Sequence, residues 1–154
     1  MKTLATLLLF VLSVMSASAA DQAPRRPPPF PSTLGMLTSF IYTAQAYRAE
    51  CAKHVTAKEL HGSVGEWFER NQPLIEQVFA AGRKAKWFSA DRSSEEVWAQ
   101  MQRTDSEAIR AQIKGLIQSA PKTMCIDGMR PFKDGSYELE NFPVHLKVLG
   151  VAVP

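Results

Sequence analysis

The sequence lacks the residue patterns of the common metal and cofactor enzymes. It has no C-x-x-C-H for covalent haem, no H-E-x-x-H for zinc, no glycine-rich phosphate loop and no EF-hand spacing. Histidine occurs three times and cysteine twice, so few side chains are suited to binding a transition metal. We therefore expect no cofactor and no enzymatic activity.

A strong net charge is also missing. The chain has 18 lysines and arginines against 15 aspartates and glutamates, a formal charge of +3 that falls to +2 if Lys2 is removed with a signal peptide. Nucleic-acid-binding domains have a strongly basic face, so we expect no nucleic-acid partner. After the first twenty residues no apolar run is long enough to span a bilayer, so we expect no transmembrane segment.

The first twenty residues have the pattern of a secretory signal peptide. Lys2 precedes an apolar run over residues 4–15, and small residues follow that suit cleavage after Ala19 or Ala20. We therefore expect a mature protein that is periplasmic or secreted. The expected organisation is a signal peptide over residues 1–20, a proline-rich N-terminal arm over 21–31 and a single helical domain with an extended C-terminal segment over 32–154.

The two cysteines predict a disulfide bond between Cys51 and Cys125, because oxidising compartments preserve such bonds. The bond would close a loop of about 75 residues, which the chain-entropy model converts to roughly 4 kcal/mol of stabilisation. Cys51 continues the apolar stripe of the first predicted helix, so its side chain is expected to face the core.

Hydrophobic spacing predicts three helical runs. The first covers residues 33–55, the second opens with the capping-box pair Ser63 and Glu66, and the longest opens with the pair Ser93 and Glu96 and ends before Pro121. Pro73 lies within the second run and removes a backbone hydrogen bond, so we expect a kink or a break there.

The residues after Pro121 lack a helical pattern. Asp127-Gly128 and Asp134-Gly135 are typical of turns, and residues 137–153 alternate in part between apolar and polar. We expect an extended tail that forms one strand or a small hairpin, or wraps the helices without regular pairing. The predicted fold is mainly α: a small bundle of three to four helices, the second kinked or broken at Pro73, with an extended C-terminal tail and one disulfide stapling the chain.

The most suggestive surface feature is a basic-aromatic cluster, which we define as Arg83, Lys84, Lys86, Trp87 and Phe88. Cations followed by aromatic rings suit an acidic partner surface or peripheral contact with an anionic surface. The interpretation that such residues more often support is structural: the cations complement a helix C-terminus and both rings lie in the core.

A metal site is a weaker alternative. His54 follows Cys51 by three residues on the predicted helix, and His61 is nearby in the sequence. A disulfide would remove Cys51 from such a site. Metal binding by His54 and His61 is therefore not the favoured interpretation.

These observations favour an exported, non-enzymatic protein that acts through a protein partner, in a chaperone-, inhibitor- or immunity-like role. The alternative is a periplasmic carrier of copper, zinc or a small ligand. An envelope hydrolase is the least favoured class, because the glutamates that could form a catalytic pair also suit a solvated helix face.

Overall fold

The computed structural model describes residues 29–152, and every regular element within that range is a helix. The predicted signal peptide and most of the proline-rich arm lie outside the described residues. The elements are α1 (Phe30–Cys51), α2 (Ala57–Leu60), the π-helical turn η1 (His61–Gly65), α3 (Glu66–Lys84), α4 (Ser94–Ile117), α5 (Pro121–Lys133), the 3-10 turn η2 (Leu139–Asn141) and α6 (Pro143–Val148). The prediction of a mainly helical fold is confirmed.

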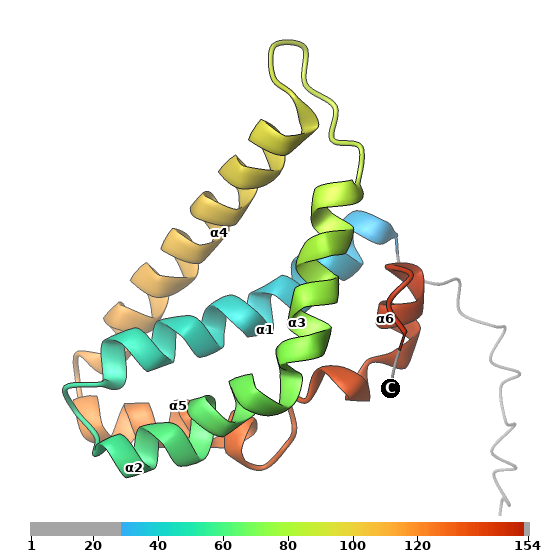
Figure 1. The fold of residues 1–154 in the computed structure, drawn as a ribbon. Helices are drawn as coiled ribbons and strands as arrows, with labels where there is room; N and C mark the ends of the chain where they lie inside the picture. The colour runs from blue at the N-terminus through green and yellow to red at the C-terminus, as the bar shows by residue number, and fades with distance from the viewer. Residues whose placement is uncertain (1–28, 153–154) are drawn as a thin grey trace, which may run out of the picture.

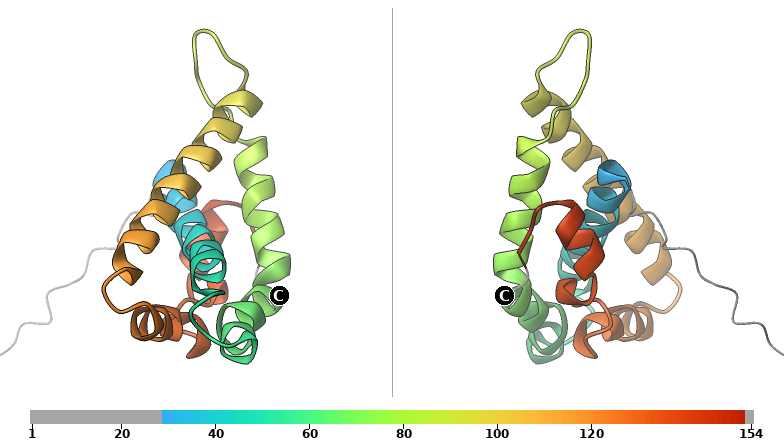
Figure 2. Two further views of the ribbon diagram at one scale, coloured as in Figure 1. Left: turned by 90° about the vertical axis from the view of Figure 1, so that its left-hand side faces the viewer. Right: turned by 90° about the vertical axis from the view of Figure 1, so that its right-hand side faces the viewer.

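Helix α1 lies at the centre of the molecule and packs against α3, α4, α5 and α6 (Figures 1 and 2). It begins at Phe30, where Pro31 suits a first helical turn that needs no backbone donor. Its predicted stripe, from Leu34 and Leu37 to Ile41, is completely buried or nearly so. The helix ends at Cys51, before the predicted end at Val55.

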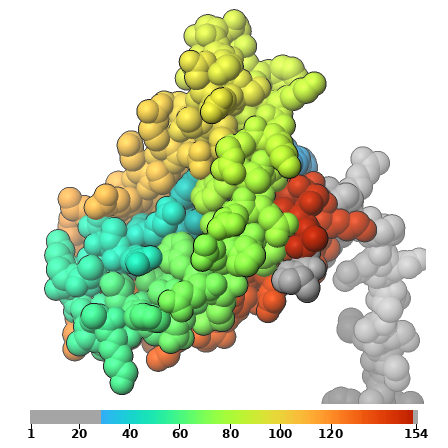
Figure 3. Space-filling view, viewed as in Figure 1, coloured from blue at the N-terminus to red at the C-terminus, as the bar shows by residue number. Residues whose placement is uncertain are grey.

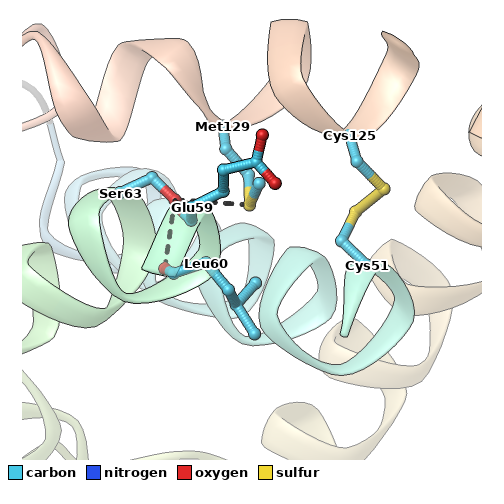
Figure 4. The surroundings of a disulfide bond; sticks show 6 residues. All are labelled: Cys51, Glu59, Leu60, Ser63, Cys125 and Met129. Atoms are coloured by element: carbon cyan, nitrogen blue, oxygen red, sulfur yellow. Dashed lines mark hydrogen bonds between the residues drawn. A yellow bond between two sulfur atoms is a disulfide. The ribbon is translucent and has the colours of Figure 1, made fainter. Parts of the chain in front are cut away.

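The predicted disulfide is present. Cys51 at the end of α1 is bonded to Cys125 in α5, with 5.7 Å between their Cα atoms, and both side chains are fully buried (Figure 4). The two cysteines are separated by 74 positions in the sequence. The bond therefore fixes the central helix to an element that comes much later in the sequence.

An ion pair joins α1 to the long helix α4. Glu50 is buried, and its Oε1 accepts a hydrogen bond of 2.6 Å from Nε of Arg110. This hydrogen bond holds the pKa of Glu50 below its ordinary value, with help from the charge of Lys114. Glu50 therefore stays ionised where the last part of α1 meets α4.

Helix α3 passes through Pro73 without a break in its helical span. In Figure 1 the chain changes direction between α2 and the upper part of α3. Two features that bend helices lie in this segment, the π-helical turn and Pro73. The predicted break is therefore wrong, and a kink located at Pro73 stays a prediction. The predicted capping box at Ser63 is also wrong, because Thr56 and Glu59 form that box.

A buried polar cluster ties α3 to the C-terminal segment. The Asn71 side chain is 1% exposed; its Nδ2 donates to Trp67 O and Glu138 Oε2, and its Oδ1 accepts from Leu139 N. Arg70 donates to Glu138 Oε1 at 2.7 Å. Burial of the Asn71 amide is offset by this set of partners, which holds the chain around Leu139 against the helix.

The prediction of an extended C-terminal tail is wrong. Residues 121–133 form α5, in which Pro121 occupies the first turn. Gly128 marks no turn; a Cβ atom there would collide with the Tyr47 ring of α1, so glycine permits the close packing of the two helices. Sequence periodicity carries no information about such a contact between helices.

The last residues form the short helix α6 instead of a strand. Pro143 starts it, and Gly150 ends it with a φ of 69°, which glycine adopts without strain. Val151 N donates to Leu146 O and Gly150 N donates to Lys147 O, the pair of bonds of a Schellman motif. These bonds satisfy carbonyl groups that an unpaired strand would leave without partners.

We expect Cys51→Ala, Cys125→Ala and the double variant to lose nearly the same free energy of unfolding, about 3 kcal/mol. Each single change already removes the bond, so the second change adds little. Urea unfolding of the three variants and of the oxidised wild type measures this. If the two single losses add up in the double variant, the cysteines stabilise the fold separately.

We expect Asn71→Ala to cost about 2–3 kcal/mol, because the buried Leu139 amide loses its acceptor. Hydrogen exchange at the Leu139 amide should accelerate more than exchange in the middle of α1. The exposed residue Gln77 on the same helix supplies the control, and Gln77→Ala should change the stability by less than about 0.5 kcal/mol. Equal losses in the two variants would contradict a specific role for Asn71.

Candidate partner-binding site

The basic-aromatic cluster lies where α3 passes into α4. Arg83 and Lys84 are exposed in the last turn of α3, and Lys86, Trp87 and Phe88 follow in the connection over residues 85–93, which we call the tip loop. The tip loop forms the narrow upper end of the molecule in Figure 1, and Figure 3 shows it in the same position with side chains.

Trp87 fixes the base of the tip loop. Its ring stacks on Trp98 of α4, with 5.8 Å between the centroids and 7° between the planes, and its Nε1 donates to Gly82 O. The Ser94 side chain accepts from Trp87 N and donates to Trp87 O. Gly82 has room only for hydrogen, since a Cβ atom there would collide with the Trp98 ring. Trp87 is therefore a structural residue.

Phe88 has the opposite environment. It is 95% exposed, more than any other large apolar residue between positions 29 and 152. Beyond it, the Ser89 hydroxyl donates to Asp91 Oδ1 at 2.7 Å, and this bond lowers the pKa of the Asp91 carboxyl group. The interpretation that places both rings in the core therefore agrees with the position of Trp87 and disagrees with that of Phe88.

A groove of about 740 Å³ lies beside the exposed ring, and we call it the tip groove. It is lined by the start of α1, the end of α3, the tip loop and the chain after α6, including Phe30, Pro31, Lys84, Lys86, Phe88 and Leu149. Within the described part of the chain no carboxylate lines it. The tip groove therefore combines an apolar surface with positive charge.

The structure brings four of the five cluster residues to this groove: Lys84, Lys86, Trp87 and Phe88. Arg83 is exposed on the same turn of α3 and is absent from the lining. Sequence reasoning missed Phe30, Pro31 and Leu149, because they come from the two ends of the domain. The apolar residues at the end of the proline-rich arm were the only available signal.

The two histidines of the alternative metal site lie apart from this groove. His54 is half-buried after α1, and His61 is exposed in η1, where its Nε2 lies 3.6 Å from Glu69 Oε1. Between residues 29 and 152, no three or more histidine, cysteine, aspartate or glutamate side chains gather as a metal site would require. Over the same range no helix is both long and apolar enough to cross a membrane.

Comparisons with models of protein families, with curated proteins and with solved structures find no match to this chain. Its function is therefore inferred from its own residues.

The structure separates Trp87 from Phe88 in a way that stability measurements test. Trp87→Ala should lower the free energy of unfolding by about 2 kcal/mol, because it removes the stack on Trp98 and leaves a cavity beside Gly82. Phe88→Ala should change it by less than about 0.5 kcal/mol, because the ring touches little protein. Chemical unfolding followed by circular dichroism measures both, and similar losses would mean that Phe88 is packed in solution.

Proposed function

We propose that this chain is an exported, non-enzymatic binding protein that holds an acidic, apolar segment of a protein partner in the tip groove. The observation that carries the proposal is the full exposure of Phe88 beside an apolar groove lined by Lys84 and Lys86. Export is inferred from the signal-like first twenty residues together with the disulfide, which persists in oxidising compartments.

Phe88 has the properties of a binding anchor. Transferring an exposed phenylalanine ring from water into a partner surface is worth about 1.5–3 kcal/mol. The ring is attached to a loop whose base is fixed by the Trp87–Trp98 stack, so the backbone beside Phe88 loses little conformational freedom on binding. Aromatic residues often dominate the energy of an interface.

The charge of the site selects the partner. Lys84 and Lys86 line the groove and Arg83 lies on the same turn as Lys84, while Phe30, Pro31 and Leu149 supply apolar contacts. Acidic side chains on the partner would pair with the cations and accelerate association at low salt. A basic segment would be repelled by the same cations.

A photocrosslinking experiment tests the proposal. A photoreactive amino acid at the exposed position Ala90 leaves Phe88 and the cations intact. We expect irradiation in the compartment to which the chain is exported to give one dominant protein adduct, with the crosslinked peptide rich in aspartate or glutamate. Phe88→Ala and the triple change of Arg83, Lys84 and Lys86 to glutamine should each reduce the adduct by roughly tenfold or more.

The matched control changes exposed cations far from the tip, Lys122→Gln with Lys133→Gln in α5. This variant should crosslink as the wild type does, and the triple variant should keep its thermal stability. Equal adducts in all variants would contradict the proposal. Adducts to anionic lipid alone would also contradict it, and would indicate peripheral membrane contact instead.

A further inference from the structure

A second cavity, of about 640 Å³, lies on another part of the molecule. It is formed by the end of α1, by α2 with the π-helical turn η1, and by α3, and we call it the α1–α3 cavity. Its lining includes Arg48, Leu60, His61, Phe68, Glu69 and Glu76. Its volume is in the range of small-molecule sites.

Opposite charges line this cavity without pairing with each other. Arg48 comes from α1, whereas Glu69 and Glu76 come from α3 and are two helical turns apart on one face. Among the described residues no salt bridge of 4.0 Å or less joins Arg48 to either carboxylate. Instead, the Glu69 carboxylate lies 3.6 Å from the His61 imidazole, and Glu76 accepts a hydrogen bond of 3.1 Å from Gln72.

The surface between these charges is apolar. Leu60, Phe68 and Ile75 are half-buried and line the cavity. The Arg48 guanidinium lies 5.8 Å from the centre of the Phe68 ring, so one face of this aromatic ring already accommodates a cation. At Gly65 a Cβ atom would lie 3.3 Å from Cγ of His61, so the absence of a side chain there leaves room for the imidazole beside the cavity.

We propose that the α1–α3 cavity binds a zwitterion with an apolar body, namely an apolar amino acid or a short apolar peptide. The ligand carboxylate would pair with Arg48, which binds carboxylates in a fork geometry. The ligand ammonium group would pair with Glu69 or Glu76, and the ligand side chain would lie against Phe68 and Ile75. This inference does not depend on the tip groove.

Charge decides between this ligand and simpler ones. An anion would lie close to two carboxylates, and a simple cation would lie close to Arg48; in each case a like charge opposes binding. A metal ion would find a single imidazole and two carboxylates that the described structure does not gather into one site. A dipolar ligand can pair with the arginine at one end and with a glutamate at the other.

Titration calorimetry on the mature, oxidised protein tests the inference with phenylalanine and with the dipeptide Phe-Phe, which distinguish a free amino acid from a peptide. Each probe is paired with its N-acetyl form, which lacks the ammonium group, and its methyl ester, which lacks the carboxylate. We expect one parent probe or both to bind, and each blocked form to bind at least roughly tenfold more weakly, the factor that 1.4 kcal/mol represents.

Variants assign the two ends of the ligand. Arg48→Gln should weaken binding of the parent probe roughly tenfold. In this variant the methyl ester and the parent should bind with equal affinity, because the carboxylate no longer has a partner. The double change Glu69→Gln with Glu76→Gln should do the same for the N-acetyl form. Arg103→Gln and Glu140→Gln, at exposed positions elsewhere, are the matched controls and should bind as the wild type does.

The inference is overturned if neither parent probe binds up to about 10 mM, or if the blocked forms bind as tightly as their parents. The triple change of Arg83, Lys84 and Lys86 at the tip should leave zwitterion binding unchanged. A loss in that variant would also overturn it, because the ligand would then lie in the tip groove. Failure here leaves the crosslinking result at Ala90 unaffected.

Discussion

The disulfide between Cys51 and Cys125 anchors the helix against which the other long helices pack. It fixes the end of α1 to α5, and α1 is the helix that contacts α3, α4, α5 and α6. A mature domain of this size buries a limited core, so one covalent link of long sequence separation is a large share of its stability. With α1 fixed at this end, α3 and α4 pack along it and converge at the tip loop (Figure 2).

The polar cluster around Asn71 fixes the C-terminal segment to α3, as the disulfide fixes α5 to α1. Asn71 and Arg70 bind Glu138 and the Leu139 amide, and so hold the turn that precedes α6. The position of α6 in turn places Leu149 in the tip groove. A hydrogen-bonded amide buried in α3 thus contributes to a surface at the other end of that helix.

The sequence allowed local features to be predicted and left out those that depend on contacts between helices. The buried stripe of α1, the disulfide and the capping box of Ser93 and Glu96 were found, because each depends on spacing or on residue chemistry alone. Gly128 was assigned to a turn, and its packing against Tyr47 depends on a partner distant in the sequence. The exposed ring of Phe88 and the half-buried ring of Trp87 belong to adjacent residues, so only the fold distinguishes them.

The tip groove is lined by three separate parts of the chain, so it forms only after all three have been synthesised. Its walls come from the first residues of α1, from the loop in the middle and from the residue that follows α6. A chain that emerges N-terminus first completes this surface only when Leu149 has docked. Cys125 likewise reaches Cys51 only after 74 positions have emerged. The groove is therefore incomplete until Leu149 has docked, and a partner that needs all of its walls would bind only the folded chain.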